Sequence, residues 1–279
     1  MKYDFHCHST FSDGTLTPTQ LLQRASDQGV NILALTDHDN IDGLIEARVA
    51  AHDHNINLIN GVEISTTWRK QLLHIVGLGV DTNNHALAEG LASVKAARSD
   101  RAIRIAEDLE RHGIHNAYQG AQQYCQQSIM SRTHFARFLV DQGHAKDMGQ
   151  VFKRFLTRGK PGYVSCEWAD LSDAVSWITQ AGGVAVIAHP ARYKLTLTKM
   201  KELLSDFSEY GGQGLEVIGS GHNTKDTELM SVLAEEFGLL SSAGSDFHDP
   251  NKGFRELGKI PPFPSRCQPI WHHDSILIN

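Results

Sequence analysis

The chain has 279 residues, of which 41% are hydrophobic and 21% are charged. This composition excludes disordered and collagen-like proteins, and the length fits one large domain such as a (β/α) barrel of about 250 residues. Four cysteines without a CxxC pair argue against a zinc ribbon or a disulfide framework.

The formal net charge is −6, which argues against a protein that coats duplex DNA. Residues 95–160 nevertheless contain 12 Lys and Arg against 6 Asp and Glu, whereas the rest of the chain contains 14 basic and 26 acidic residues. This basic segment either steers a phosphate-bearing ligand or is an ordinary solvated helical surface. No signal-peptide core and no membrane-length apolar run is found, so we expect a cytoplasmic protein without membrane contact.

Short apolar segments predict seven strands, in chain order Tyr3–His8, Ile32–Thr36, Leu58–Ile64, Leu72–Val80, Val184–Ala188, Leu215–Ile218 and Leu239–Ala243. Helical patterns separate most of them: Pro18–Gln28, Asp42–Asp53, Leu171–Ala181, Thr198–Tyr210 and Thr224–Phe237. Nearly continuous apolar strands that alternate with helices are typical of parallel sheets. We therefore expect a closed or nearly closed α/β barrel, with an open sheet as the alternative.

Residues 95–159 interrupt this rhythm, because the patterns there are helical only: Ala96–Arg111, Ala117–Gln127, Arg132–Gln142 and Asp147–Thr157. We predict an all-helical insertion over 95–159 that caps one end of the barrel. The barrel would then comprise 1–94 and 160–258. The proline-rich remainder, 259–279, is expected to be an irregular tail.

Histidines and carboxylates gather where the predicted strands end, which is where barrel enzymes place their sites. A lone histidine of this kind is usually structural, but a set of nine indicates a metal site: His6, His8, Asp13, His38, Glu63, His74, His134, Asp246 and His248. Imidazole and carboxylate without thiolate favour a hydrolytic site with Mn²⁺, or alternatively Fe²⁺ or Zn²⁺. Nine ligands suit two or three ions, an arrangement that hydrolyses phosphoesters.

The motifs HCHSTFSDG, TDHD, GVEIS, RTH, AHP and SDFH, in this order from residue 6 to residue 248, resemble those of the PHP (polymerase and histidinol phosphatase) family. The resemblance implies a distorted (β/α)7 barrel with three metal ions. One ion would take His6, His8, Glu63 and Asp246, a second Glu63, His74 and His134, and a third Asp13, His38 and His248. Asp13 stands where some members have a histidine.

Within the family, the chain is most similar to a subgroup of nucleotide phosphatases and 5′→3′ exoribonucleases. This similarity implies hydrolysis of the 3′-phosphate of nucleoside 3′,5′-bisphosphates, or removal of 5′ nucleotides from short 5′-phosphorylated RNA. Small phosphorylated nucleotides or RNA 5′ ends would be the partners, with no obligate protein partner.

Several further residues are candidates for substrate contacts. Ser131 and Arg132 begin a predicted helix, where free N–H groups and a guanidinium can bind phosphate. Arg137, Arg192 and His222 are weaker phosphate candidates, and His189 is a candidate general acid. Asp37 and Asp39 are expected to orient ligands rather than bind metal.

Two questions remain open at the level of sequence. Arg98, Arg101 and Arg104 share a helical face that is either solvated or a track for an RNA backbone. The site could also serve a small non-nucleotide monoester such as histidinol phosphate, or belong to a metal-binding module without catalytic activity.

Overall fold

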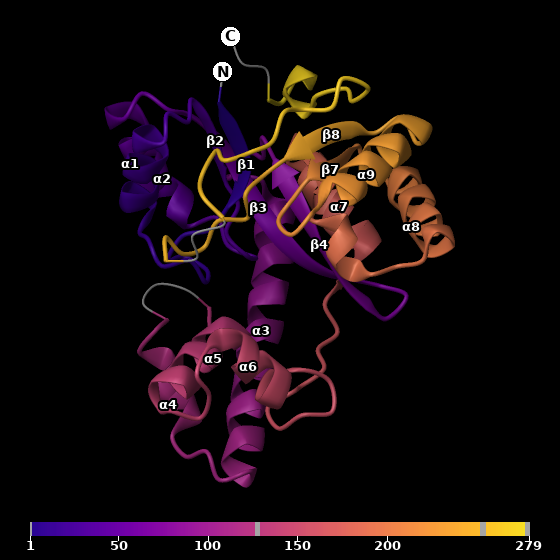
Figure 1. Cartoon of the computed structure of the whole chain (residues 1–279). Helices are drawn as coiled ribbons and strands as arrows, with labels where there is room; N and C mark the ends of the chain where they lie inside the picture. Colours follow the sequence, from indigo (N-terminus) through magenta and orange to yellow (C-terminus); the bar gives the residue numbers. More distant parts are fainter. Residues whose placement is uncertain (1, 126–128, 252–254, 277–279) are drawn as a thin grey trace.

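The computed structural model describes residues 2–125, 129–251 and 255–276. Its upper lobe in Figure 1 is a mixed sheet with the strand order β1-β2-β3-β4-β6-β7-β8, and β5 pairs with β3. The strands are β1 (Tyr3–Cys7), β2 (Ile32–Leu35), β3 (Asn57–Trp68), β4 (Gln71–Leu78), β5 (Ala169–Asp170), β6 (Val184–Ile187), β7 (Gly214–Ile218) and β8 (Leu240–Ala243). A parallel bridge between Cys7 and Phe247 brings the chain after β8 beside β1. The sheet is thus nearly closed, and the predicted α/β barrel is confirmed.

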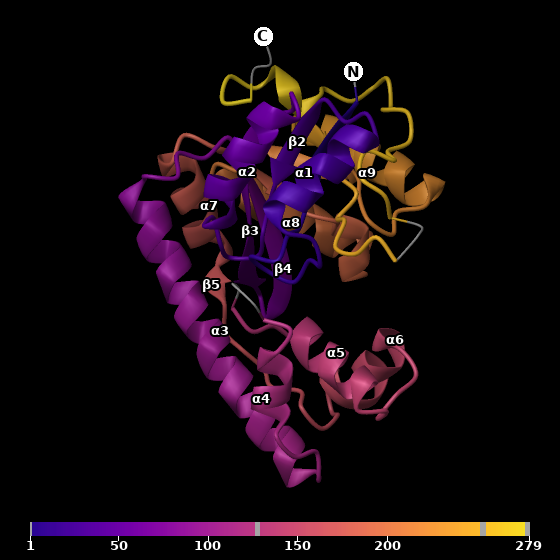
Figure 2. The ribbon, with the colours of Figure 1, turned by 90° about the vertical axis from the view of Figure 1, so that its left-hand side faces the viewer.

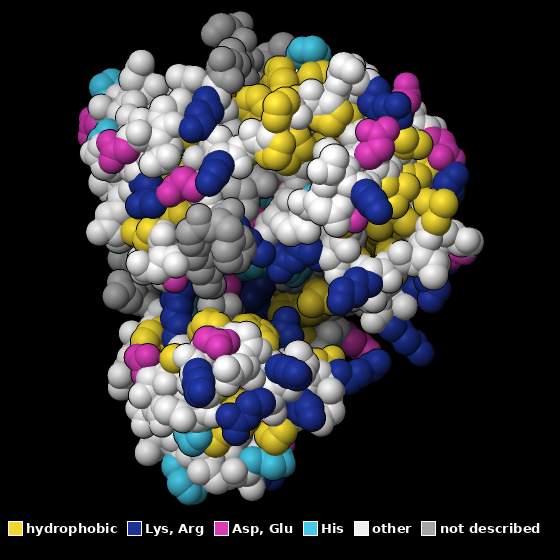
Figure 3. Space-filling model, viewed as in Figure 1, with side chains coloured by type: hydrophobic (Ala, Val, Ile, Leu, Met, Phe, Trp, Pro, Cys, Tyr) yellow, Lys and Arg dark blue, Asp and Glu magenta, His cyan; other side chains and the backbone are white. Residues whose placement is uncertain are grey.

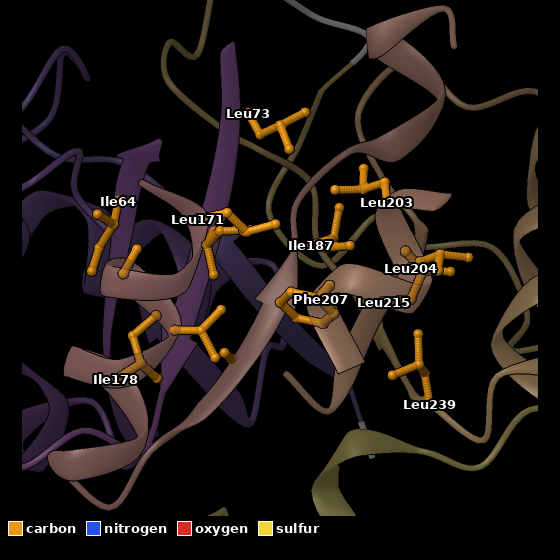
Figure 4. Close-up of a cluster of buried hydrophobic side chains, with 14 of the residues drawn as sticks. Ile64, Leu73, Leu171, Ile178, Ile187, Leu203, Leu204, Phe207, Leu215 and Leu239 are labelled. Carbon is orange, nitrogen blue, oxygen red and sulfur yellow. The ribbon is translucent and has the colours of Figure 1, made fainter. Parts of the chain in front are cut away.

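Helices cover the outside of this barrel because each has one apolar face. They are α1 (Pro18–Asp27), α2 (Gly43–Asp53), α7 (Leu171–Gln180), α8 (Leu197–Glu209) and α9 (Thr224–Glu236). Helix α1 begins at a capping box formed by Thr17 and Gln20, with Pro18 in its first turn. In Figure 4, Ile178 of α7 and Phe207 of α8 point into one buried apolar cluster with side chains of the sheet, among them Ile64 and Ile187.

One strand runs against the expected direction. Strand β4 is antiparallel to both β3 and β6, whereas the other paired strands are parallel. The reason is that β3 continues to Trp68 and returns through a two-residue turn, in which Arg69 and Lys70 have positive φ angles. The first residues of β4 therefore lie at the same barrel end as the last residues of β3.

The lower lobe is helical, as Figures 1 and 2 show from two sides. It contains α3 (His85–Arg111), α4 (Ala117–Gln122), α5 (Arg132–Asp141) and α6 (Met148–Val151), which continues into a π-helical turn, Phe152–Leu156. Its own core includes Leu109, Phe135 and Leu139. Helix α3 begins in the barrel lobe and crosses the boundary predicted at residue 95. The predicted helix Ala117–Gln127 ends earlier, and 126–128 lie outside the described residues.

A close contact fixes the upper part of α3 on the barrel. A Cβ atom on Gly90 would lie 2.2 Å from the ring of Trp177 in α7, so only glycine permits this approach. At the opposite end of the barrel from the insert, Ile270 and Ile276 of the tail are buried against Phe5 and Leu78. Among the described helices, none is long and apolar enough to cross a membrane.

Candidate active site

The carboxyl ends of the parallel strands face the insert, and a cleft of about 450 Å³ lies between the two lobes. Figure 3 shows Lys and Arg side chains lining the opening of this cleft. Since β4 is antiparallel, His74 near its start is paired with Ser65 of β3 and lies at the same end of the barrel as Glu63. The reversed strand thus supplies a site residue from its first half.

Among the residues that the structure describes, three groups of side chains have nitrogen and oxygen atoms close enough to share a metal ion. The first contains His6, His8 and Glu63, the second His38, Glu63 and His74, and the third His8, Asp13, His38 and His248. Asp246 joins the first group, since its Oδ1 lies 3.3 Å from Nε2 of His8. Glu63 is common to two groups and is fully buried. Nitrogen and oxygen atoms grouped in this way could hold metal ions, and Glu63 could contribute to two of the groups.

The hydrogen bonding within these groups is incomplete. Asp13 Oδ1, His38 Nδ1, Glu63 Oε2 and His189 Nδ1 are buried and make no hydrogen bond of normal geometry, although His38 Nδ1 lies 2.9 Å from Glu63 Oε2 and Asp13 Oδ1 lies 3.1 Å from His248 Nε2. Buried polar atoms normally have hydrogen-bond partners, so these atoms require an explanation. Divalent cations bound by Asp13, His38 and Glu63 would supply partners for three of them, so these residues fit a metal site with nitrogen and oxygen ligands.

The protonation states also suit metal binding. Burial favours neutral Glu63, but His38, His74 and His6 outweigh it and hold the pKa of this carboxyl well below its usual range. Burial lowers the pKa of His38 to about 4. Burial acts in the same direction on His8, but its contacts with Asp246 and Glu63 raise the pKa to about 9. The carboxylates are thus ionised, and a cation would displace the proton of His8.

Buried acids behind the site orient the histidines. Glu216 of β7 lies 3.1 Å from Nδ1 of His6 and accepts a hydrogen bond from the backbone N–H of His189. Asp37 accepts hydrogen bonds from Ser9 and Ser12, and Asp39 accepts one from the Ser65 N–H at 2.6 Å. Because these partners of Asp37 and Asp39 are serines, the role expected for the two carboxylates in orienting metal ligands stays a prediction.

Backbone conformation adds to this picture. Asp39, His189 and Asp246 have positive φ angles of 51°, 32° and 51°. Residues other than glycine adopt such angles rarely, mostly in turns, and strained residues of this kind also cluster at functional sites. His189 and Asp246 line the cleft, which supports its identification as a candidate functional site.

Guanidinium groups surround the carboxylates. The cleft is lined by five arginines: Arg98, Arg101, Arg132, Arg192 and Arg255. Burial and the neighbouring Arg132 lower the pKa of Arg101 to about 10, and burial and Arg98 lower that of Arg132. Arg101 and Arg132 have no carboxylate partner within the described residues. A bound phosphate would relieve the repulsion between them.

Two of the five arginines contact the metal-ligand candidate Asp246. Arg192 lies 2.8 Å and Arg255 lies 3.3 Å from its Oδ2 atom. The expected placement of Arg192 at the site thus agrees with the structure. Arg255, beyond the SDFH motif, was not anticipated, because nothing in its local sequence distinguishes it.

The side chain of Arg98 is buried, whereas the helical periodicity of the sequence favours a solvated side chain at this position. Only 8% of this residue is exposed, and its guanidinium forms an ion pair with Asp39 and a 2.9 Å hydrogen bond with Ser65. Arg101 donates to the carbonyl of Val164 and also lines the cleft, whereas Arg104 is paired with Asp100 outside it. The three arginines therefore do not form one continuous track.

His134 has partners other than those expected from the family resemblance. Its Nδ1 accepts a 2.9 Å hydrogen bond from the Ser131 N–H in a capping box, and its ring also contacts the backbone of Ser12. In the described chain it belongs to none of the three groups of candidate ligands. His189 lies instead beside Glu63, with Nε2 3.0 Å from Oε1, and its ring is 5.3 Å from that of His74.

The remaining phosphate candidates divide between the cleft and its surroundings. Ser131 and Arg132 line the cleft. Arg137 instead donates a 2.7 Å hydrogen bond to the carbonyl of Asp13. His222 contacts the backbone of Gly219 and Val217 behind the site and does not line the cleft.

Aromatic side chains also line the cleft. Phe152 and Trp168 both line the cleft, and Arg132 lies over the Phe152 ring with its Cζ 5.8 Å from the centroid. Trp168 is covered by Arg98 and Arg101, at 5.1 and 5.4 Å. The cleft thus offers apolar ring surface beside its charges, which suits a ligand with a flat ring and phosphate groups.

Known proteins resemble this chain over nearly its whole length. It is 48% identical over 269 residues to a 3′,5′-nucleoside bisphosphate phosphatase of Chromobacterium violaceum, a match that covers 96% of this chain and 94% of that protein. It is 46% identical over 270 residues to a 5′-3′ exoribonuclease of Haemophilus influenzae, covering 97% and 98%.

Solved structures show the same similarity. An amidohydrolase of Chromobacterium violaceum, solved with sulfate and without metal, has a TM-score of 0.93 and 47% identity and covers 98% of this chain and 95% of its own. A protein of Bifidobacterium adolescentis, assigned as a metal-dependent phosphoesterase, has a TM-score of 0.86 at 26% identity, covering 97% and 98%. The PHP domain model matches residues 4–181. With its barrel, its histidine motifs and these relatives, the chain belongs to the PHP domain family.

Proposed function

We propose that this protein is a metal-dependent phosphoesterase that hydrolyses the 3′-phosphate of nucleoside 3′,5′-bisphosphates, removes 5′ nucleotides from short 5′-phosphorylated RNA, or does both. The observation that carries the proposal is that the candidate metal ligands share one cleft with Arg101 and Arg132, which have no carboxylate partner among the described residues. Both chemistries require water attack on a phosphoryl group and charge neutralisation around it.

We assign the ligands to three sets of side chains. His6, His8, Glu63 and Asp246 form one set, and Asp13, His38 and His248 form another. The remaining set is Glu63, His74 and His189, in place of His134, because the neutral imidazole of His189 lies beside Glu63. Divalent cations held there, Mn²⁺ by preference, would lower the pKa of coordinated water and neutralise phosphoryl oxygens.

The chain's own residues then bind and orient the substrate. Ser131 and Arg132 at the start of α5, together with Arg101, would hold one phosphate, since both guanidinium groups and the positive end of the helix dipole line the cleft there. Arg192 and Arg255 lie on the Asp246 side of the cleft and would hold the other phosphate. Phe152 and Trp168 would contact the nucleoside.

The test is to supply purified protein, loaded with Mn²⁺, with 3′-phosphoadenosine 5′-phosphate and with a 5′-phosphorylated tetranucleotide. Release of inorganic phosphate or of 5′ nucleotides is expected. Absence of both products would contradict the substrate assignment. Histidinol phosphate belongs in the same panel, because its preferential hydrolysis would establish the competing monoester function. His8→Ala serves as the inactive control.

The cell compartment follows from the cysteines and the substrates. Cys7, Cys166 and Cys267 form no disulfide with one another, which is typical of a protein in a reducing compartment. We therefore propose a cytoplasmic enzyme that acts on nucleotides or RNA ends without a protein partner.

A further inference from the structure

The insert carries exposed cations that have no acidic partner. Lys153, Arg154, Arg158 and Lys160, here called the basic ridge, are all exposed. Four other cations of residues 95–160 have carboxylate partners: Lys95 pairs with Asp42, Arg98 with Asp39, Arg104 with Asp100 and Arg111 with Asp108. Within the described residues, no ion pair neutralises the ridge, so its charge is available to an external ligand.

The basic ridge is continuous with the cleft. Phe152 lines the cleft and is followed directly by Lys153 in the same π-helical turn. After residue 157 the chain packs on α3, where the Gly162 N–H donates a 2.8 Å hydrogen bond to Asp108. Seven residues separate Asp108 from Arg101, which lines the cleft, and this spacing corresponds to roughly 10 Å along the helix.

The ridge thus leads from the mouth of the cleft along the insert, away from the barrel. Figure 3 shows Lys and Arg side chains gathered over this part of the insert, below the cleft. The same segment accounts for the uneven charge of the sequence, since the rest of the chain is acidic. A polyanion that leaves the cleft would therefore meet attraction on the insert and repulsion elsewhere.

The volume of the cleft indicates which phosphorylated ligands can be bound entirely within it. A volume of about 450 Å³ is in the range of pockets for single small molecules, roughly 300–1,000 Å³. A nucleoside bisphosphate fits inside such a pocket, but an RNA strand held by its 5′ end must continue outside it. Its phosphates would then need cations that the cleft does not supply.

We propose that the basic ridge binds the phosphates of the RNA nucleotides that lie 3′ to the one being removed. This inference rests on the proposed function and adds to it a surface for longer substrates. Contacts with phosphates carry no sequence information, so binding along the ridge is independent of base sequence. The ridge makes the enzyme sensitive to RNA length and leaves hydrolysis of a mononucleotide unaffected.

The test compares Lys153→Glu/Arg158→Glu/Lys160→Glu with a control of equal charge change, Lys199→Glu/Lys225→Glu/Lys259→Glu. The control lysines are exposed and lie on the barrel lobe and the tail. Arg154 is kept, because it donates to the His144 carbonyl and stacks on Phe155. Kinetics are measured with 3′-phosphoadenosine 5′-phosphate and with 5′-phosphorylated di-, tetra- and octanucleotides.

For the ridge variant, KM for the octanucleotide should rise about tenfold or more, whereas the bisphosphate and dinucleotide should be unaffected. Binding of a phosphorothioate octanucleotide should depend less steeply on salt, by about 0.7 in log–log slope for each lost contact. An unchanged octanucleotide KM, or equal losses on all substrates, would overturn the ridge while the proposed function stands. If the unmodified enzyme cleaves none of the substrates, the proposed function is wrong. The proposal for the basic ridge is then tested by binding alone, and it is wrong if both variants bind the octanucleotide equally well.

Discussion

The hydroxyl of Thr133 in the insert donates a hydrogen bond to Oδ2 of Asp13 in the barrel, at 2.8 Å. Arg137 holds the same residue by its carbonyl, and Oδ1 of Asp13 lies 3.1 Å from Nε2 of His248. Helix α5 thus fixes the orientation of a candidate metal ligand that another lobe contributes. The insert supports the metal centre as well as covering it.

Thr133→Val should weaken metal binding at the Asp13 group, because it removes the hydrogen bond while keeping the size of the side chain. Loss of such a contact typically costs ten- to a hundredfold in affinity. The measurement is the metal content of the protein after dialysis against graded concentrations of Mn²⁺. Thr133→Ser keeps the hydroxyl and should bind like the original protein, so equal weakening of both variants would argue against the hydrogen bond.

Replacement of His134 and of His189 by alanine should have different consequences. His134→Ala leaves the Ser131 N–H without its partner, which should lower the free energy of unfolding by about 1–3 kcal/mol with the bound-ion count unchanged. His189→Ala should bind one ion fewer, because it removes a neighbour of Glu63. Metal analysis and urea unfolding of both variants distinguish these outcomes. Loss of an ion from the His134 variant alone would restore the assignment that the family resemblance implies.

Metal affinity should increase as the pH rises towards 9. A cation must displace the proton of His8, whose contacts with Asp246 and Glu63 outweigh burial and raise its pKa from 6.5 to about 9. The gain is at most about tenfold per pH unit from this residue. Calorimetric titration with Mn²⁺ in buffers of different ionisation enthalpy measures both the affinity and the protons released. An affinity that is constant over this range would refute the raised pKa.

The raised pKa of His8 also predicts that the stability of the metal-free protein falls as the pH rises. A pKa that is raised in the folded state stabilises the protein fully below the unfolded value, near 6.5, and this contribution is lost as the pH rises through about 9. Thermal unfolding in the presence of a chelator should therefore occur at lower temperature at the upper end of this window. His8→Gln should abolish this part of the dependence.

Glu216→Gln should impair the centre without unfolding the protein. The amide can still contact His6 but lacks the charge that fixes the imidazole, so we expect metal affinity to fall ten- to a hundredfold. Equilibrium dialysis with Mn²⁺ measures the change. Glu209→Gln, an exposed position on α8, controls for the loss of one negative charge, and an equal effect there would remove Glu216 from the site.

The barrel and most candidate ligands could be predicted because polar residues that follow apolar strands are visible locally. The direction of β4 could not be predicted, since side chains alternate in the same way in parallel and in antiparallel strands. Arg98 reads as a solvated helical residue, because its partner Asp39 lies 59 positions away. Glu216 did leave a signal, as a carboxylate within the apolar strand LEVI, but its role depends on the proximity of His6.

The stiffness of helix α3 affects how a ligand can reach the candidate metal site. It runs for 27 residues without proline, and Gly90 is its only glycine. Its first turns are fastened to Trp177 and its middle to Asp39, while Leu109 near its far end anchors the lower core. A continuous helix bends little without such interruptions. The helix therefore acts as a stiff connection between the two lobes, and we expect the width of the cleft to change little when a ligand binds.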